Sequence, residues 1–311
     1  MAQGIDVLEN GRPVIQVFSN LHHSRNEKGK TTEFQLIRSY LGYNLNYNDN
    51  FSAKVVFDVA PPNEESSLDY HAFMKEASLT YKKDKLVVKF GVIPMKQFLL
   101  IQDIWGYRYI MATFQDKNKF GPSNDLGLNI EYKFTDIIST DIALSNGEGF
   151  KRAQTDNKMR YGTGITLKPT EKLFFRLYGD IIPHLDTIQA TASLFVAYHL
   201  KNNYTIGAES SYQKNNKFVD NHKIYGISIF GNYQFTEKIG VFSRYDILKS
   251  NIEEGQSNPW NNTENGSIYM IGLEFAPLEH VKFSLNGRYV SNEDRTVGKQ
   301  TSVYLNVLYK F

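Results

Sequence analysis

The sequence contains no cysteine. This absence excludes disulfide frameworks, thiolate metal sites, cysteine nucleophiles and a lipid-modified N-terminal cysteine. The formal net charge is only +2 at pH 7, so no strong field of one sign points to nucleic acid as a partner. Residues 1–4 do not form a charged segment followed by an apolar core. We therefore interpret the chain as a mature protein from which a signal peptide has been removed.

Long apolar runs are also absent. The clearest one covers residues 98–101, far short of the about 20 apolar residues that a membrane-spanning helix needs. The mean hydropathy is −0.41, and no long segment shows a helical period. The sequence therefore excludes residence in a membrane by helices. Residence by a β-barrel stays open, because each strand of a barrel contributes apolar residues only at alternate positions.

Aromatic residues, in contrast, are abundant. They make up 14% of the chain, with 20 Tyr and 21 Phe. This content suits the two aromatic girdles that a transmembrane barrel places at the membrane interfaces. Aromatic-rich soluble β-proteins share the same composition, so only the positions of the aromatic residues can distinguish a membrane barrel from a soluble β-protein.

The stretch 301–311 at the end of the sequence shows a first such pattern. Successive strand residues point to opposite sides, so one face is mostly polar and the other is apolar. The apolar face comprises Val303, Leu305, Val307, Tyr309 and Phe311. A strand that faces lipid needs this pattern, although an ordinary sandwich strand can end in phenylalanine too. The stretch resembles the closing strand of bacterial outer-membrane β-barrels, which implies that the assembly machinery recognises Phe311.

The same amphipathic pattern recurs from end to end, with short polar turns and longer polar loops in alternation. It is cleanest over residues 123–134, where Leu126, Leu128 and Ile130 face one way. We predict an all-β fold, a single transmembrane antiparallel β-barrel over residues 1–311 with about 16 strands, 14 or 18 being the alternatives. Its short turns would be periplasmic and its long loops extracellular. A closed barrel has no exposed sheet edge, so its backbone is satisfied in lipid.

Residues 93–122 differ from the other connections. The segment is too apolar for a solvated loop and too long to lack a function. We expect it to fold into the lumen and narrow an aqueous channel. The constriction residues that we predict are Lys96, Asp103, Arg108 and Asp116 from this segment, and Arg38, Lys89 and Arg176 from the wall. In the alternative interpretation these charges pair and fix the loop, each pair contributing ~0–1 kcal/mol where it is hydrated.

Four short stretches around this segment carry a family resemblance. They are a glycine-to-proline step over residues 91–95, a Trp- and Arg-containing stretch at 105–110, Ser-x-Asp-Leu-Gly at 123–127 and Ser-Asn-Gly-Glu-Gly at 145–149. They resemble the outer-membrane porin family of Gram-negative bacteria, in particular the phosphate-selective-porin-like (porin O/P-like) proteins of Bacteroidetes. The resemblance covers the whole chain loosely and residues 91–150 with some specificity.

The resemblance implies an outer-membrane protein in contact with lipid and lipopolysaccharide, and a passive diffusion channel of a kind that is often a homotrimer. It does not imply phosphate binding, because the inward positions mix both charges where phosphate would need a dense ladder of Arg and Lys. A slight excess of basic residues favours a weak preference for anions. Trp105 and Tyr107 could either line a path for sugars or pack against the wall.

Other functions have weaker support in the sequence. An outer-membrane phospholipase would need a base beside Ser145, and residue 143, where its histidine would stand, is Ala143. We therefore expect no enzyme, and no cofactor or metal site. The acidic loops 63–65 and 292–294 are more typical of solvated charge than of a calcium site. A structural or plugged barrel within a larger outer-membrane assembly, with partner proteins, is the main alternative. A soluble all-β binding protein would have to bury Leu126, Leu128 and Ile130.

Overall fold

The computed structural model describes residues 10–61, 70–200 and 203–311, so the expected acidic loop at 63–65 lies outside the described residues. Within them, sixteen strands close into one barrel in which each strand pairs antiparallel with the next and β1 pairs with β16. The prediction of an all-β barrel with about 16 strands is confirmed. The strands are β1 Gly11–Asn26, β2 Gly29–Asn46, β3 Phe51–Ala60, β4 His71–Lys83, β5 Leu86–Pro94, β6 Asn124–Lys133, β7 Ile138–Ser145, β8 Arg160–Thr170, β9 Leu173–His184, β10 Thr187–Leu200, β11 Tyr204–Lys214, β12 Lys223–Gln234, β13 Ile239–Ser250, β14 Gly266–Leu278, β15 Val281–Asn292 and β16 Lys299–Lys310.

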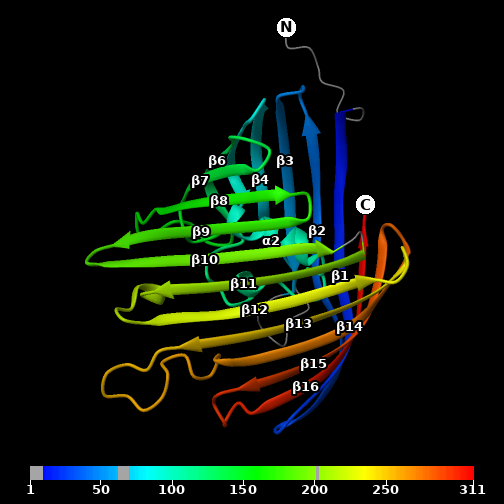
Figure 1. The fold of residues 1–311 in the computed structure, drawn as a ribbon, viewed down its shortest axis with the longest axis vertical. Coiled ribbons are helices and arrows are strands. Elements are labelled where there is room, and N and C mark those ends of the chain that lie inside the picture. The colour runs from blue at the N-terminus through cyan, green and yellow to red at the C-terminus, as the bar shows by residue number, and fades with distance from the viewer. Residues whose placement is uncertain (1–9, 62–69, 201–202) are drawn as a thin grey trace.

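The connections at one rim are all short, whereas the other rim has the longer connections together with two-residue turns at 27–28 and 185–186. Four of the short turns use the same device, in which one side-chain oxygen accepts hydrogen bonds from backbone N–H groups two and three residues further on. The acceptors are Asn48, Thr135, Thr170 and Thr236. The longer connections include 146–159 and 251–265. In Figure 1 strands β8–β13 cross the view from side to side and β2 and β3 stand nearly upright, as the tilt of barrel strands requires.

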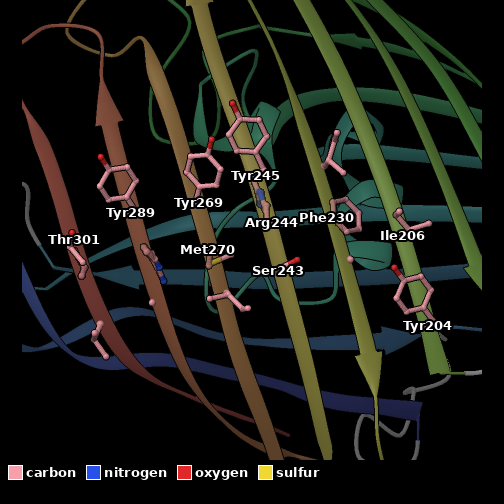
Figure 2. A pocket seen from close by; sticks show the side chains of 17 residues that line it. Tyr204, Ile206, Phe230, Ser243, Arg244, Tyr245, Tyr269, Met270, Tyr289 and Thr301 are labelled. Atoms are coloured by element: carbon pink, nitrogen blue, oxygen red, sulfur yellow. The ribbon is translucent and has the colours of Figure 1, made fainter.

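The two faces of the wall differ as the alternation predicts. On β14, Tyr269, Ile271 and Leu273 are exposed, whereas Met270 and Glu274 are buried. Figure 2 shows tyrosines of neighbouring strands, including Tyr269, side by side with their hydroxyls pointing the same way. They line a shallow groove on the outward face of β11–β16. Among the described residues, no helix has the length and apolar character to cross a membrane.

The hypothesis of a soluble binding protein fails on the same face. It required Leu126 and Ile130 to lie in a core, but their side chains are 47% and 39% exposed. Asn129, between Leu128 and Ile130, is buried on the opposite face. The apolar residues of β6 therefore face outward, and its polar residues face the enclosed side.

A β-bulge interrupts the alternation in β4. Val56 of β3 pairs with Glu76, but the next pair is Phe57 with Met74, so Lys75 is an extra residue on the bulged strand. The bulge brings Lys75 to the same side as Glu76, and the Lys75 ammonium lies 4.7 Å from the centroid of the buried Tyr40 ring.

Candidate functional site

Residues 95–123 join β5 to β6 and contain the helices α2, Lys96–Trp105, and α3, Phe114–Lys117. We call these residues the long segment. Helix α2 ends at Gly106, whose backbone is left-handed (φ 73°) and whose N–H donates to the carbonyl of Gln102. Glycine adopts this conformation without steric cost, so it ends the helix and turns the chain toward the next contacts.

Aromatic side chains fix the middle of the long segment against the wall. The Trp105 ring is 1% exposed and lies 5.1 Å from the ring of Phe230 on β12 and 6.2 Å from that of Phe242 on β13. The Tyr107 ring lies 4.4 Å from Phe242. The indole N–H of Trp105 donates to the carbonyl of Met111, so its polar atom is satisfied as well. Of the two interpretations of Trp105 and Tyr107, these contacts correspond to packing.

Hydrogen bonds from buried wall side chains hold the segment in place. Arg244 Nη1 donates to the carbonyl of Ala112 at 2.7 Å, and the Tyr109 hydroxyl donates to Glu274 at 2.7 Å. The backbone N–H of Phe114 donates to Glu209 at 2.8 Å. Arg244 lies on β13, which is eight strands from β5 in a ring of sixteen. The segment therefore leaves β5 and is bonded to the opposite wall.

The charged residues of the buried face are mostly paired, in most cases across strands and in the case of Arg244 and Asp246 within β13. Seven ion pairs have N···O distances between 2.6 and 3.2 Å. Such pairing avoids isolated buried charges, which are costly. The pairs are Arg38–Asp58, Lys54–Glu76, Lys89–Glu76, Arg160–Asp180, Arg176–Asp141, Arg244–Asp246 and Lys282–Glu274.

A cavity of about 430 Å³ separates the long segment from strands β1–β4 and β16. We call it the passage. Its lining is mixed in charge but predominantly basic, because four of its charged residues are cations and two are carboxylates. These residues are Lys54, Lys75, Arg108, Lys310, Glu76 and Asp103. Partial burial in the passage wall raises the pKa of Asp103 above its ordinary value, and the nearby Lys96 opposes this effect.

The residues predicted for the constriction have different surroundings. Asp103 and Arg108 line the passage, and Arg108 forms an ion pair with Asp116 at 3.2 Å. Lys96 is paired with Glu131 of β6. The three predicted wall residues are bonded to wall carboxylates, and Arg176 is almost fully buried against Asp141 and Thr166. The structure thus brings Arg108 and Asp116 together, gives Lys96 and the three wall residues separate carboxylate partners, and places Asp103 in the passage lining.

Lys75 is a lining residue that the sequence did not reveal. Strict alternation puts it on the face opposite Glu76, and only the bulge in β4 brings both residues to the passage. A lysine beside a glutamate in an amphipathic strand is a common pattern, so no local signal marks the bulge. The Lys75 ammonium faces the rings of Tyr40 and Phe150 at 4.7 and 5.2 Å from their centroids.

The candidate residues for enzymatic and metal chemistry have ordinary surroundings. Ser145 is fully buried, and its hydroxyl has no hydrogen-bond partner in the part of the chain that the structure describes. In loop 292–294, Glu293 is paired with Lys249, and Asp294 accepts a hydrogen bond from the Thr296 N–H at 2.8 Å. No group of three or more His, Cys, Asp or Glu side chains within the described residues could hold a metal ion.

Comparison with known proteins gives both a family and a fold. Residues 113–307 match the family model described as "Putative beta-barrel porin-2, OmpL-like", which covers more than half of the chain. No curated protein matches this sequence. The family and the fold together point to a channel in the outer membrane rather than to an enzyme.

Solved structures resemble the chain over nearly its whole length. OprB of Pseudomonas putida has a TM-score of 0.73 at 10% identity, covering 98% of this chain and 96% of its own. The outer-membrane channel DcaP of Acinetobacter baumannii has a TM-score of 0.70 at 12% identity, covering 97% of each chain. An anion-selective porin from Comamonas acidovorans has a TM-score of 0.71 at 10% identity, covering 97% of this chain and 99% of its own. Identities this low show the shared fold alone.

Proposed function

Because this chain belongs to the OmpL-like beta-barrel porin-2 family of outer-membrane porins, we propose that it is a passive diffusion channel for small hydrophilic solutes and ions with a weak preference for anions. In this proposal the long segment lies in the lumen and narrows the water-filled path. Solutes would cross the narrowest part beside Asp103 and Arg108.

The charge of the passage lining carries the proposal of anion preference. Glu76 is shared between Lys54 and Lys89, so one carboxylate faces two ammonium groups at 3.1 and 3.0 Å. Lys75 contacts aromatic rings, and no carboxylate within the described residues forms an ion pair with it. The cations of the passage are thus only partly neutralised, and charges that line a narrow aqueous path select among ions.

We do not extend the proposal to phosphate selectivity. The buried arginines Arg176 and Arg244 of the wall each donate to both oxygens of one carboxylate, at 2.7 to 3.0 Å. Arginines that are neutralised in this way do not form the ladder of free cations that a phosphate-selective channel would require. The sequence motifs suggest a relationship to the Bacteroidetes proteins. This relationship is a proposal about the family and does not identify a transported solute.

The test is single-channel current from the purified, folded protein in a planar lipid bilayer under a salt gradient. We expect stable current steps and a reversal potential whose sign shows that anions cross more readily than cations. A reversal potential of the opposite sign would contradict the anion preference and leave the channel intact. Protein that is folded by its heat-dependent gel mobility but gives no current would contradict the channel and favour a structural or plugged barrel.

A further inference from the structure

A second cavity of about 710 Å³ lies at the rim of the long connections. We call it the vestibule. It shares no lining residue with the passage, and residues of the long segment, of connections 146–159 and 251–265 and of strands β8–β13 surround it. Six of its charged lining residues are cations and two are carboxylates. These residues are Lys117, Lys119, Arg152, Lys158, Arg160, Lys217, Glu148 and Glu264.

Arg160 is the buried charged group of the vestibule, with a 1% exposed side chain. Its Nη2 donates to Gln97 Oε1 and Asp180 Oδ2, each at 2.6 Å. Its Nε and Nη1 have no hydrogen-bond partner among the residues that the structure describes. Buried donors normally have acceptors, and a guanidinium binds a carboxylate with two parallel N–H groups. Arg160 therefore has donor capacity beyond its bond to Asp180, which favours negative charge near this wall of the vestibule.

The chain is shaped to bring the long segment against this guanidinium. A Cβ atom on Gly121 would lie 2.3 Å from both Nη1 and Nη2 of Arg160, so a larger residue there would require the guanidinium to move. Lys119, Lys217 and Phe218 also line the vestibule, and their φ angles are 58°, 55° and 62°. Left-handed backbone is uncommon for such residues and is concentrated at ligand sites.

The vestibule also has apolar and aromatic walls. The Trp260 ring stacks on His222 at 4.2 Å with an interplanar angle of 11°, and its N–H donates to the carbonyl of Lys223. The Lys158 ammonium lies 4.1 Å from the centroid of the Phe218 ring and also pairs with Asp156. Aliphatic side chains such as Ile224 complete the lining. A cavity of this size that combines apolar walls with a few convergent charged groups is typical of a site for a small organic molecule.

We propose that the vestibule binds organic carboxylates with a planar or apolar body and captures them before they enter the channel, an inference that rests on the proposed function. The ammonium groups of Lys119 and Lys217 would receive the carboxylate, and the Arg160 guanidinium would add positive charge from the vestibule wall. Trp260, Phe218 and the aliphatic side chains would contact the body of the solute. Inorganic phosphate would use only the charged half of this site.

Benzoate is the probe, with acetate and inorganic phosphate as comparators. Each anion is added to the side of the long connections while single-channel current is recorded in a planar bilayer. Benzoate should interrupt the current at roughly tenfold lower concentration than acetate, since partial burial of an aromatic ring contributes about that factor to binding. Equal potency of benzoate, acetate and phosphate would show that the site has no preference for an organic body and would overturn the proposal.

The double variant Lys119→Gln/Lys217→Gln tests the cations of the site. The matched control is Lys28→Gln/Lys30→Gln, which removes the same charge from exposed lysines outside the lining of the vestibule. The first variant should weaken the benzoate effect roughly threefold to tenfold, as expected for two partly hydrated ion pairs, and the control should not change it. Equal benzoate effects in the two double variants would overturn the assignment to the vestibule.

Calorimetric titration of benzoate into the folded barrel in detergent separates this inference from the channel proposal. Binding heat that is lost in Lys119→Gln/Lys217→Gln and kept in the control would support the vestibule even if no current is seen, in which case only the channel proposal would fail. Stable current steps without any benzoate effect and without binding heat would refute the vestibule and leave the channel proposal standing.

Discussion

Replacing Arg244 with methionine should destabilise the barrel strongly, because this one side chain both neutralises a buried carboxylate and bonds the long segment. The Arg244 guanidinium donates to both carboxylate oxygens of Asp246 at 2.7 and 2.8 Å, and to the carbonyl of Ala112 at 2.7 Å. The side chains of Arg244 and Asp246 are only 1% and 4% exposed. Arg244→Met leaves Asp246 buried without its partner, so the free energy of unfolding should fall by about 3–5 kcal/mol.

Two further variants distinguish the effect of the unpaired Asp246 carboxylate from the effect of the lost hydrogen bond to the long segment. Arg288 Nη2 donates to the carbonyl of Ile110 at 2.9 Å, but its other side-chain acceptor is the amide oxygen of Asn286. Arg288→Met therefore removes a tether without stranding a charge and should cost about 1–2 kcal/mol. Arg244→Met/Asp246→Leu removes both charges and should recover most of the stability that Arg244→Met loses.

The assay is denaturant unfolding of the folded barrel followed by tryptophan fluorescence, because Trp105 lies 5.2 Å from the Arg244 guanidinium. Single-channel recordings should also show larger fluctuations of the open-channel current in Arg244→Met, because the long segment loses its hydrogen bond from Arg244 to Ala112. A double variant as unstable as Arg244→Met would refute the reasoning, because the loss could then not come from the buried charge of Asp246.

Three other predictions concern selectivity and assembly. Lys75→Gln should shift the reversal potential toward cation preference, because a unit charge about 7 Å from a passing ion contributes roughly one RT in water. The exposed control Lys172→Gln, outside the passage, should leave the reversal potential unchanged. An equal shift in both variants would contradict the assignment of Lys75 to the ion path. Burial raises the pKa of Asp103, so this carboxylate should be protonated before an ordinary aspartate when the pH is lowered from neutrality toward about 4. Loss of its negative charge should increase the anion preference of the channel. The same pH response in Asp103→Asn would exclude Asp103 as the cause. Gly91→Ala should impair assembly, since Gly91 has φ 114° and an added Cβ would lie 2.1 Å from the carbonyl oxygen of Ala77; normal yields of heat-modifiable barrel would count against this.

The fold could be predicted from the sequence because its main signal is local. A barrel wall separates two environments, and successive residues of a strand point alternately to each. The alternation in 123–134 and 301–311 therefore reports directly which side chains face outward, and the exposed Leu126 and buried Asn129 follow it. The number of strands follows from repeating this pattern between turn signals, so about 16 strands could be inferred without knowing which strands pair.

The surroundings of the charged residues could not be predicted in the same way, because they depend on register and on irregularities. Arg38 and Asp58 are 20 positions apart in sequence and meet only because β2 and β3 pair with one particular register. Lys75 reaches the passage through a bulge that leaves no mark in the sequence. The long segment was recognisable as unusual from its length and apolar content, but its bonds to Glu209 and Glu274 join residues about a hundred positions or more apart.

The charged residues of the wall have two different roles, stabilising the barrel and setting its ion preference, and ion pairing decides which role each residue has. A cation within about 3 Å of a carboxylate fixes a strand or the long segment, but the pair contributes little net field to the water beside it. Lys75 is held differently, because the faces of Tyr40 and Phe150 attract its ammonium without neutralising the charge. Substitutions within pairs such as Arg244–Asp246 should therefore change stability more than selectivity, whereas Lys75 should change selectivity more than stability. The net charge of the chain cannot predict ion preference, because most of its buried charges cancel locally.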